Sequence, residues 1–398
     1  MPMDDLIKPE DMIKKLGVEG LCRSAEEYFK TITDITPLMT KPFHVVSEGA
    51  YLLCKLGVML SGLRLGKGMT ILDFGAGSCW LSRFLNELSC ATISLDPSPT
   101  ALEIGKKLFK QLPLLGSPIA DPCFLHFDGR KIQLADDSVD RVICFDAFHH
   151  VPNQEEMLAE FYRVLKPGGI AGFGEVGPQH SRSPQSQKEM RTYNVLENDI
   201  VLEHLEKVSQ QIGFSGLYCK LFSFPDLEID YPDYLRMARK KKIPKAIGRH
   251  ITNSMNDYPI FFLIKGKYTP DSRIPTGLNH GIFIEQTNYT VKAGEPFSVT
   301  VEIENKGNTR WLFQNIKDIG VVNLGIHLFS KDNRLIDYDF LRFNLGKDVL
   351  PGEKLKKTVQ MKAEDKGSFQ MVLDLVAEHV CWFEENNSKP VTLWVEVI

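Results

Sequence analysis

Four side chains that can accept a proton stand at the ends of two apolar runs in the second quarter of the sequence. His149 and His150 are adjacent after one run, Glu175 ends the next run, and His180 follows it. A neutral imidazole is a suitable base near pH 7, and a carboxylate is a weaker one. Because consecutive side chains point in different directions, we expect one of the two adjacent histidines to reach a pocket, and we rank His150 first. Either of the two could instead be a hydrogen-bonded wall residue.

A glycine turn supplies a second group of candidate residues. A short apolar run ends in Asp73, and Gly75, Ala76 and Gly77 precede a segment with helical apolar periodicity. Glycine lets the backbone turn sharply and approach a ligand without a Cβ in the way. The pattern of strand, tight turn and helix predicts a ligand site at the carboxyl end of a first parallel strand, with Ser78 as the helix cap. The turn could also be a purely structural connection.

An acidic residue at the end of the next predicted strand fits the same site. Residues 91–95 read as a short strand that ends in Asp96, and Pro97 leads into the next helix. A carboxylate at this point can accept hydrogen bonds from both hydroxyls of a ribose, although a helix cap is the structural alternative. NAD enzymes also place an acid here. A dinucleotide fingerprint, however, has glycine where this chain has Trp80, which disfavours a pyrophosphate ligand.

Three further segments follow the glycine turn in order. A strand is predicted to end in Asp128-Gly129, a buried strand leads through Phe145 to the histidine pair, and residues 165–169 (LKPGG) end an amphipathic helix. Together with the glycine turn, this order resembles the type 11 group of class I S-adenosylmethionine-dependent methyltransferases. The resemblance covers about residues 40–267.

The resemblance implies S-adenosyl-L-methionine as the cofactor and an α/β fold, a Rossmann-like doubly wound sheet whose last strand, 259–265, is antiparallel to the others. In that family the glycine turn passes the amino-acid moiety of the cofactor, and an acid after the third strand approaches the adenine. The cofactor-binding residues that it implies are Asp73, Gly75, Ala76, Gly77, Asp96, Pro97, Asp128, Gly129 and Phe145.

The chain length suggests two or three domains. Residues 1–66 read as a helical lid, and 67–268 as the methyltransferase domain, with an insertion at 223–258. The candidate lid residues, which could instead be core residues, are Tyr28, Phe43 and His44. The insertion carries basic residues that could bind a phosphate or simply form a solvated helix face: Arg236, Arg239, Lys240, Lys241, Lys242, Lys245 and Arg249.

The composition changes after Tyr268. The polar segment 269–277 reads as a linker, and beyond it apolar and polar residues alternate with a period of two. About seven strands separated by turns predict an antiparallel β-sandwich over 278–398, which resembles immunoglobulin-like accessory modules. Glycan binding, formation of a homodimer or a passive structural role would each suit such a domain.

Composition excludes some partners. The net charge of −4 gives no indication of nucleic acid as the main partner. The eight cysteines are scattered without metal-ligand spacing, so no metal is expected, and a reducing, cytoplasmic compartment fits. Cys54, Cys90 and Cys144 stand in apolar runs and are predicted to be buried. No signal peptide is recognisable, and no uninterrupted apolar stretch approaches the roughly 20 residues of a membrane span.

These observations favour an S-adenosylmethionine-dependent methyltransferase that O-methylates a sugar or glycan hydroxyl. An alcohol needs its proton removed by a base, and residues 177–187 resemble a stretch of bacterial methyltransferases associated with glycan assembly. The alternatives are a methyltransferase of another small metabolite, a NAD-dependent oxidoreductase, and a methyltransferase-like scaffold whose β-sandwich binds glycan or protein.

Overall fold

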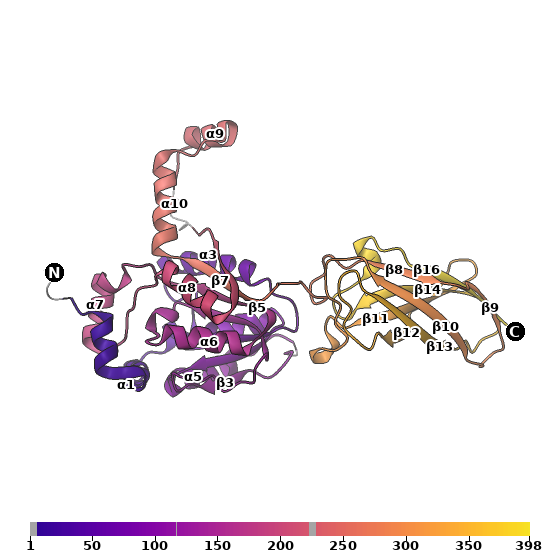
Figure 1. Cartoon of the computed structure of the whole chain (residues 1–398), viewed down its shortest axis with the longest axis horizontal. Helices are drawn as coiled ribbons and strands as arrows, with labels where there is room; N and C mark the ends of the chain where they lie inside the picture. Colours follow the sequence, from indigo (N-terminus) through magenta and orange to yellow (C-terminus); the bar gives the residue numbers. More distant parts are fainter. Residues whose placement is uncertain (1–5, 117, 223–227) are drawn as a thin grey trace. The chain divides into compact units, whose positions relative to one another are not determined.

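A computed structural model describes residues 6–116, 118–222 and 228–398 (Figure 1). The chain divides into two compact units. The first contains residues up to Leu65 and from Met69 to Tyr268, and the second contains Gly66–Gly68 and Thr269–Ile398. Each unit has its own hydrophobic core.

The first unit is built on a seven-stranded sheet with the order β3-β2-β1-β4-β5-β7-β6. Strands β1 to β5 are parallel, and β7 is antiparallel to both β5 and β6, which confirms the predicted doubly wound sheet and its inverted last strand. The strands are β1 (Thr70–Phe74), β2 (Ala91–Asp96), β3 (Cys123–His126), β4 (Val139–Phe145), β5 (Leu165–Gly174), β6 (Phe214–Lys220) and β7 (Ile260–Lys265).

Alternating apolar residues bury both faces of this sheet. In β4, Val142 and Cys144 belong to one core cluster and Ile143 to another. The first face is covered by α6 (Gln154–Val164) and α8 (Leu202–Ile212). The second is covered by α3 (Val46–Leu63), α4 (Trp80–Glu87) and α5 (Pro99–Gln111). The other helices are α1 (Pro9–Thr31), α2 (Thr36–Met39), α7 (Pro184–Tyr193), α9 (Tyr231–Lys240) and α10 (Lys245–Asp257).

The neighbours of β1 in the sheet are β2 on one side and β4 on the other, so the strand order reverses at β1. Doubly wound sheets bind ligands in the crevice beyond the carboxyl ends of the strands at such a reversal. The backbone leaves β1 through Gly75 (φ +70°) and Gly77 (φ +51°). A Cβ on Gly75 would lie 2.5 Å from the Cβ of Ala147, so the close approach of this turn to the end of β4 requires glycine.

Two local predictions were wrong. The hydroxyl of Ser78 donates to the carbonyl of Leu38, 2.8 Å away, and α4 begins after Cys79 without a side-chain cap. Cys90 and Cys144 are buried as predicted, but Cys54 is exposed on α3.

Among the residues that the structure describes, α3 is the one helix whose length and composition would allow it to cross a membrane. Sequence analysis did not single it out because Glu48 and Lys55 interrupt its apolar run. Leu56, Met59 and Leu63 are buried in the sheet core, and a Cβ at Gly62 would overlap the ring of Phe262 in β7. This is the packing of a core helix.

The second unit consists of two sheets with one core between them. One sheet has the order β13-β10-β8, and the other has the order β12-β11-β14-β16-β9, with β15 paired to β14. The pairing is antiparallel, as predicted, except that β9 and β16 are parallel. The strands are β8 (His280–Ile284), β9 (Asn288–Val291), β10 (Phe297–Asn305), β11 (Val322–Ser330), β12 (Leu335–Asn344), β13 (Lys354–Met361), β14 (Gly367–Ala377), β15 (Cys381–Trp382) and β16 (Val391–Val397).

Candidate active site

A cavity of about 370 Å³ opens at the carboxyl ends of β1, β2 and β4. Its walls come from the glycine turn, the first residues after β2 and β4, and the N-terminal helices. Of the residues that the sequence implied for cofactor binding, those that line this cavity are Gly75, Ala76, Gly77, Asp96, Pro97, Gly129 and Phe145.

Asp96 is the buried acid of the cavity. One carboxylate oxygen accepts the N–H of Gly77 and the other accepts the N–H of Ser98, both at 2.8 Å. Burial raises the pKa of Asp96 to about 6, although these two hydrogen bonds work in the opposite direction. A carboxylate has about four acceptor sites, so the group is held rigidly by the backbone and still has capacity for a ligand.

The other two predicted acids lie outside the cavity lining. Asp73 is buried behind the glycine turn and accepts a hydrogen bond of 2.7 Å from the hydroxyl of Ser82, which joins β1 to α4. Burial raises the pKa of Asp73 to about 7. Asp128 accepts the backbone N–H groups of Arg130 and Lys131, at 2.9 and 3.1 Å, and so closes its own turn. Both side chains have structural partners, and their contact with a cofactor stays a prediction.

The N-terminal helices cover part of the cavity. Tyr28 and Phe29 of α1 line it, whereas Phe43 is 67% exposed and lies outside the lining. His44, which also lies outside the lining, pairs with Glu48 within α3 at 3.1 Å. Sequence analysis missed Glu26, whose carboxylate accepts hydrogen bonds from the hydroxyls of Ser98 and Thr100 at 2.7 and 2.8 Å. These bonds attach α1 to the start of α5, two residues from Asp96.

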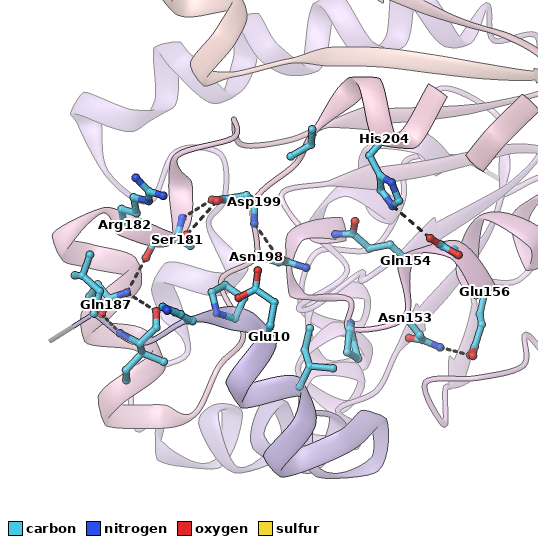
Figure 2. A pocket seen from close by; sticks show the side chains of 18 residues that line it. Glu10, Asn153, Gln154, Glu156, Ser181, Arg182, Gln187, Asn198, Asp199 and His204 are labelled. Carbon is cyan, nitrogen blue, oxygen red and sulfur yellow. Dashed lines mark hydrogen bonds and ion pairs between the residues drawn. The ribbon is translucent and has the colours of Figure 1, made fainter. Parts of the chain in front are cut away.

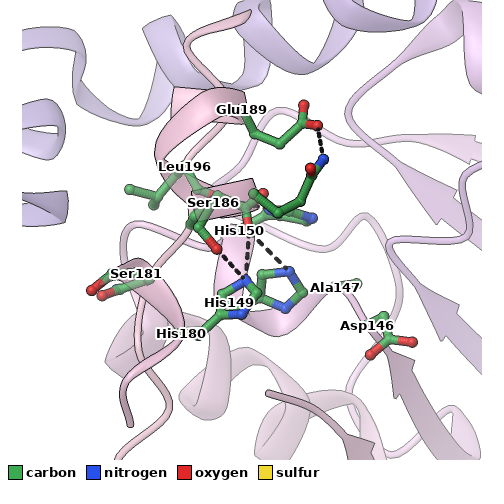
Figure 3. Close-up of polar contacts among 12 residues, drawn as sticks. Asp146, Ala147, His149, His150, His180, Ser181, Ser186, Glu189 and Leu196 are labelled. Carbon is green, nitrogen blue, oxygen red and sulfur yellow. Dashed lines mark hydrogen bonds and ion pairs between the residues drawn. The ribbon is translucent and has the colours of Figure 1, made fainter. Parts of the chain in front are cut away.

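The histidine pair forms a short 3-10 turn, Phe148–His150, after β4 (Figure 3). The side chain of His150 is 40% exposed and lines the cavity. Its Nδ1 lies 2.6 Å from the carbonyl oxygen of Leu196. Because a carbonyl only accepts, we assign the proton of the neutral ring to Nδ1, and Nε2 then carries the lone pair.

Glu175 positions this turn and does not line the cavity. The carboxylate is fully buried at the end of β5 and accepts the N–H groups of Ala147 and Phe148, at 3.1 and 2.8 Å. It also lies 2.7 Å from Nδ1 of His149. Burial lowers the pKa of His149 well below its ordinary value, so this imidazole is neutral near pH 7. Its Nδ1–H donates to Glu175, which leaves the lone pair on Nε2.

Sequence analysis missed Glu197, which joins the histidines. Its carboxylate lines the cavity and lies 2.6 Å from Nε2 of His180 and 3.6 Å from Nδ1 of His150. Burial would raise the pKa of Glu197, but the hydrogen bond from His180 and the other two imidazoles lower it below its ordinary range. The rings of His149 and His150 lie 4.0 Å apart, and those of His149 and His180 lie 5.0 Å apart. No pattern in the sequence marks Glu197.

A buried ion pair was also missed. Lys55 of α3 is fully buried and pairs with Asp146, the first residue after β4, which lines the cavity. The ammonium group also lies 4.9 Å from the centre of the Phe145 ring. A single lysine within an apolar helical run was the available signal, because a buried lysine requires a partner.

A second, larger cavity of about 850 Å³ shares the lining residues Pro152 and Asn153 with the first. Figure 2 shows side chains that line this second cavity. Its walls include the chain before α1 and the start of α6. Gln187 closes one side by pairing with the backbone N–H and carbonyl of Ile7, both at 2.9 Å. The glycine turn and the three histidines lie outside its lining.

Comparison with known proteins agrees with this geometry. A family model described as a methyltransferase domain matches residues 72–173. The chain is similar to an uncharacterized methyltransferase of Oceanobacillus iheyensis (27% identity over 139 residues, 34% of this chain and 61% of the relative). It is also similar to one of Schizosaccharomyces pombe (39% over 102 residues, 25% of this chain and 36% of the relative). The chain thus spans less than two thirds of the length of these relatives.

Among solved structures, it is similar to an S-adenosylmethionine-dependent methyltransferase of Mesorhizobium loti, with 16% identity, a TM-score of 0.40 and coverage of 53% of this chain and 97% of that one. The matched residues, 72–173, run from β1 to β5 and include the glycine turn, Asp96 and the histidine pair. Residues 72–173 thus match a methyltransferase domain, and a unit of two β-sheets follows it in the chain.

Proposed function

We propose that this protein transfers a methyl group from S-adenosylmethionine to a hydroxyl of a sugar or glycan. The observation that carries the proposal is the cavity at the reversal of the sheet, within the matched methyltransferase domain. The glycine turn and Asp96 form one wall of it and His150 another.

The residues fit this cofactor. The cavity has the size of a small-molecule site, and Asp96 presents a buried carboxylate for the ribose hydroxyls. Tyr28, Phe29 and Phe145 add aromatic walls. When bound, the cofactor supplies an electrophilic methyl group, so the protein has to orient the acceptor, exclude water and remove a proton.

His150 is the residue best placed to remove that proton. With the Nδ1–H donated to Leu196, the Nε2 lone pair is available on a ring that faces the cavity. Glu197, 3.6 Å from the ring, would stabilise the imidazolium that forms. Glu175 holds the backbone of the turn and is a positioning residue.

The lining supports a polar acceptor. Asp146, Glu189 and Glu197 supply carboxylate acceptors for hydroxyl groups. The basic residues that were predicted to bind a phosphate are exposed on α9, α10 and their connection and lie outside the lining of this cavity, so a phosphate on the acceptor stays a prediction; they are Arg236, Arg239, Lys241, Lys242, Lys245 and Arg249. The same three carboxylates would also suit an amine, so N-methylation is the second candidate.

The test is a methylation assay of the full chain with labelled S-adenosylmethionine. Nucleotide sugars, lipid-linked oligosaccharides and small amines are the acceptor panels, and Asp96→Ala is the matched control with weakened cofactor binding. We expect label in the sugar panels, at an oxygen. Transfer to amines alone would replace the sugar proposal with the second candidate, and absence of cofactor binding would contradict both.

A further inference from the structure

We infer that the wall of the cavity formed by His149, His150 and Glu197 is a binding site for a divalent transition-metal ion, with zinc as the best-suited ion. One ligand atom from each of these residues lies within 4.8 Å of the other two. Imidazole nitrogen and carboxylate oxygen are the ligands of catalytic zinc sites, in which three protein ligands leave one position open.

The first argument is the gap between two buried side chains that can both bind a metal ion. His149 donates its Nδ1–H to Glu175, so its Nε2 presents a lone pair. That Nε2 lies 3.9 Å from a carboxylate oxygen of Glu197, and both side chains are over nine-tenths buried. That separation is too long for a direct hydrogen bond, and the same oxygen lies 2.6 Å from Nε2 of His180. Zinc ligand atoms lie about 2.0–2.2 Å from the ion, so a separation of 3.9 Å accommodates one ion with small adjustments.

The second argument is the set of residues behind the ligands. Metal-binding histidines commonly donate their other ring N–H to a carboxylate or a backbone carbonyl, which fixes the ring and the tautomer. His149 has this arrangement with Glu175, and His150 has it with the carbonyl of Leu196. His180 holds Glu197 through a contact of 2.6 Å. Each of the three proposed ligands is therefore already oriented by a partner.

The third argument is access. His149 is buried, but His150 and Glu197 line the cavity, so an ion held by the three residues would have an open position toward it. This consequence rests on the proposed function. An acceptor hydroxyl at that position would become more acidic, and His150 would act as a ligand rather than as a free base. The binding of the metal itself doesn't depend on the identity of the acceptor.

Metal binding can be measured on the full chain. After treatment with a chelator, zinc is titrated in competition with a chromophoric chelator, and bound metal is counted by elemental analysis. We expect one zinc per chain. His149→Ala and Glu197→Gln should each weaken binding at least 100-fold, and Glu175→Gln should weaken it about 10–100-fold. His204→Ala, which removes a half-exposed histidine outside the cluster, should leave binding unchanged.

Absence of zinc binding would overturn the inference. Binding that survives both ligand variants would also overturn it, because the eight free cysteines could then hold the zinc non-specifically. Circular dichroism checks that each variant is folded, and His150→Ala serves as the third ligand variant if one of the others is not. Methylation is measured in parallel with and without chelator. Full turnover by the zinc-free protein would overturn the effect of the metal on the acceptor hydroxyl and keep the proposed function. Stoichiometric, variant-sensitive zinc in a protein without methyl transfer would do the reverse.

Discussion

Each unit of the protein contains a buried histidine–carboxylate pair, and the two pairs have different surroundings. In the methyltransferase domain, His149 pairs with Glu175, and in the β-sandwich, His280 pairs with Asp374. All four side chains are almost completely buried. The His280 ring stacks near Phe383, and its second nitrogen has no hydrogen-bond partner in the described part of the chain.

The two pairs differ in the surroundings of the second ring nitrogen of each histidine. Beyond His149 lie two more imidazoles and Glu197, and this cluster reaches the cavity. Beyond His280 lies the apolar core of the sandwich. The same chemical pair therefore leads to a cavity in one unit and is enclosed in the other. A buried titratable pair indicates chemistry only when it leads to a space that a ligand can enter.

The largest expected effect is on turnover, at the cluster of side chains beside the first pair. We expect His150→Ala to lower kcat by about 10²–10⁴-fold, the range for loss of a general base, while the affinity for S-adenosylmethionine stays nearly constant. Steady-state kinetics and calorimetry measure the two quantities. Full turnover of this variant would mean that the side chains beside His149 do not take part in catalysis, so that the two buried pairs would not differ in function.

The second pair should affect stability alone. His280→Ala leaves the Asp374 carboxylate buried with the N–H of Glu384, 3.0 Å away, as a remaining partner. Removing the partner of a buried carboxylate costs about 3–5 kcal/mol of the free energy of unfolding. Urea unfolding should show this loss in the sandwich transition. A fall in kcat under conditions where the variant is folded would contradict the comparison.

Two acids at the ends of neighbouring strands sharpen the comparison within the methyltransferase domain. Asp96→Ala should weaken cofactor binding by about 1–3 kcal/mol, because it leaves polar partners unpaired. The resemblance predicts a similar loss of cofactor affinity for Asp128→Ala. Because Asp128 lies outside the cavity lining, the structure predicts a smaller loss. Titration calorimetry with both variants decides between these two expectations. Equal losses of cofactor affinity would show that the cofactor contacts Asp128 as well, outside the cavity lining.

The smallest expected effect is a dependence of cofactor affinity on pH. Because burial raises the pKa of Asp96 to about 6, the carboxylate is mostly ionised at pH 7 and mostly protonated at pH 5. Affinity for ribose hydroxyls should therefore fall by up to about tenfold between pH 7 and pH 5. The folding stability of the ligand-free protein depends on pH in the opposite direction. Because the pKa of Asp96 is raised in the folded state, its contribution to stability is lost as pH rises through about 6. Calorimetry at several pH values tests this, and Asp96→Asn should flatten the profile.

Local features of the first unit could be predicted from the sequence. The run before Asp73, the glycine turn and α4 are contiguous, and hydrogen bonds between near neighbours dominate such a segment. Alternation from Phe297 to Ile303 likewise predicted β10, because every second residue of a strand faces the core. Ser78 was mispredicted because the carbonyl of Leu38, 40 residues away, binds its hydroxyl.

The sequence by itself determined the ligand turn, the end of β2 at Asp96 and the change to a β-sandwich, since periodicity and turn residues act over short distances, and the doubly wound sheet followed from its resemblance to a known family. Only the tertiary structure decided which candidate residues meet. It placed Glu197 between three imidazoles, paired Lys55 with Asp146 across 91 residues, and put Glu175 behind the histidine turn. These contacts arise because parallel strands bring distant segments together at one edge of the sheet, and no local pattern records which side chains will touch there.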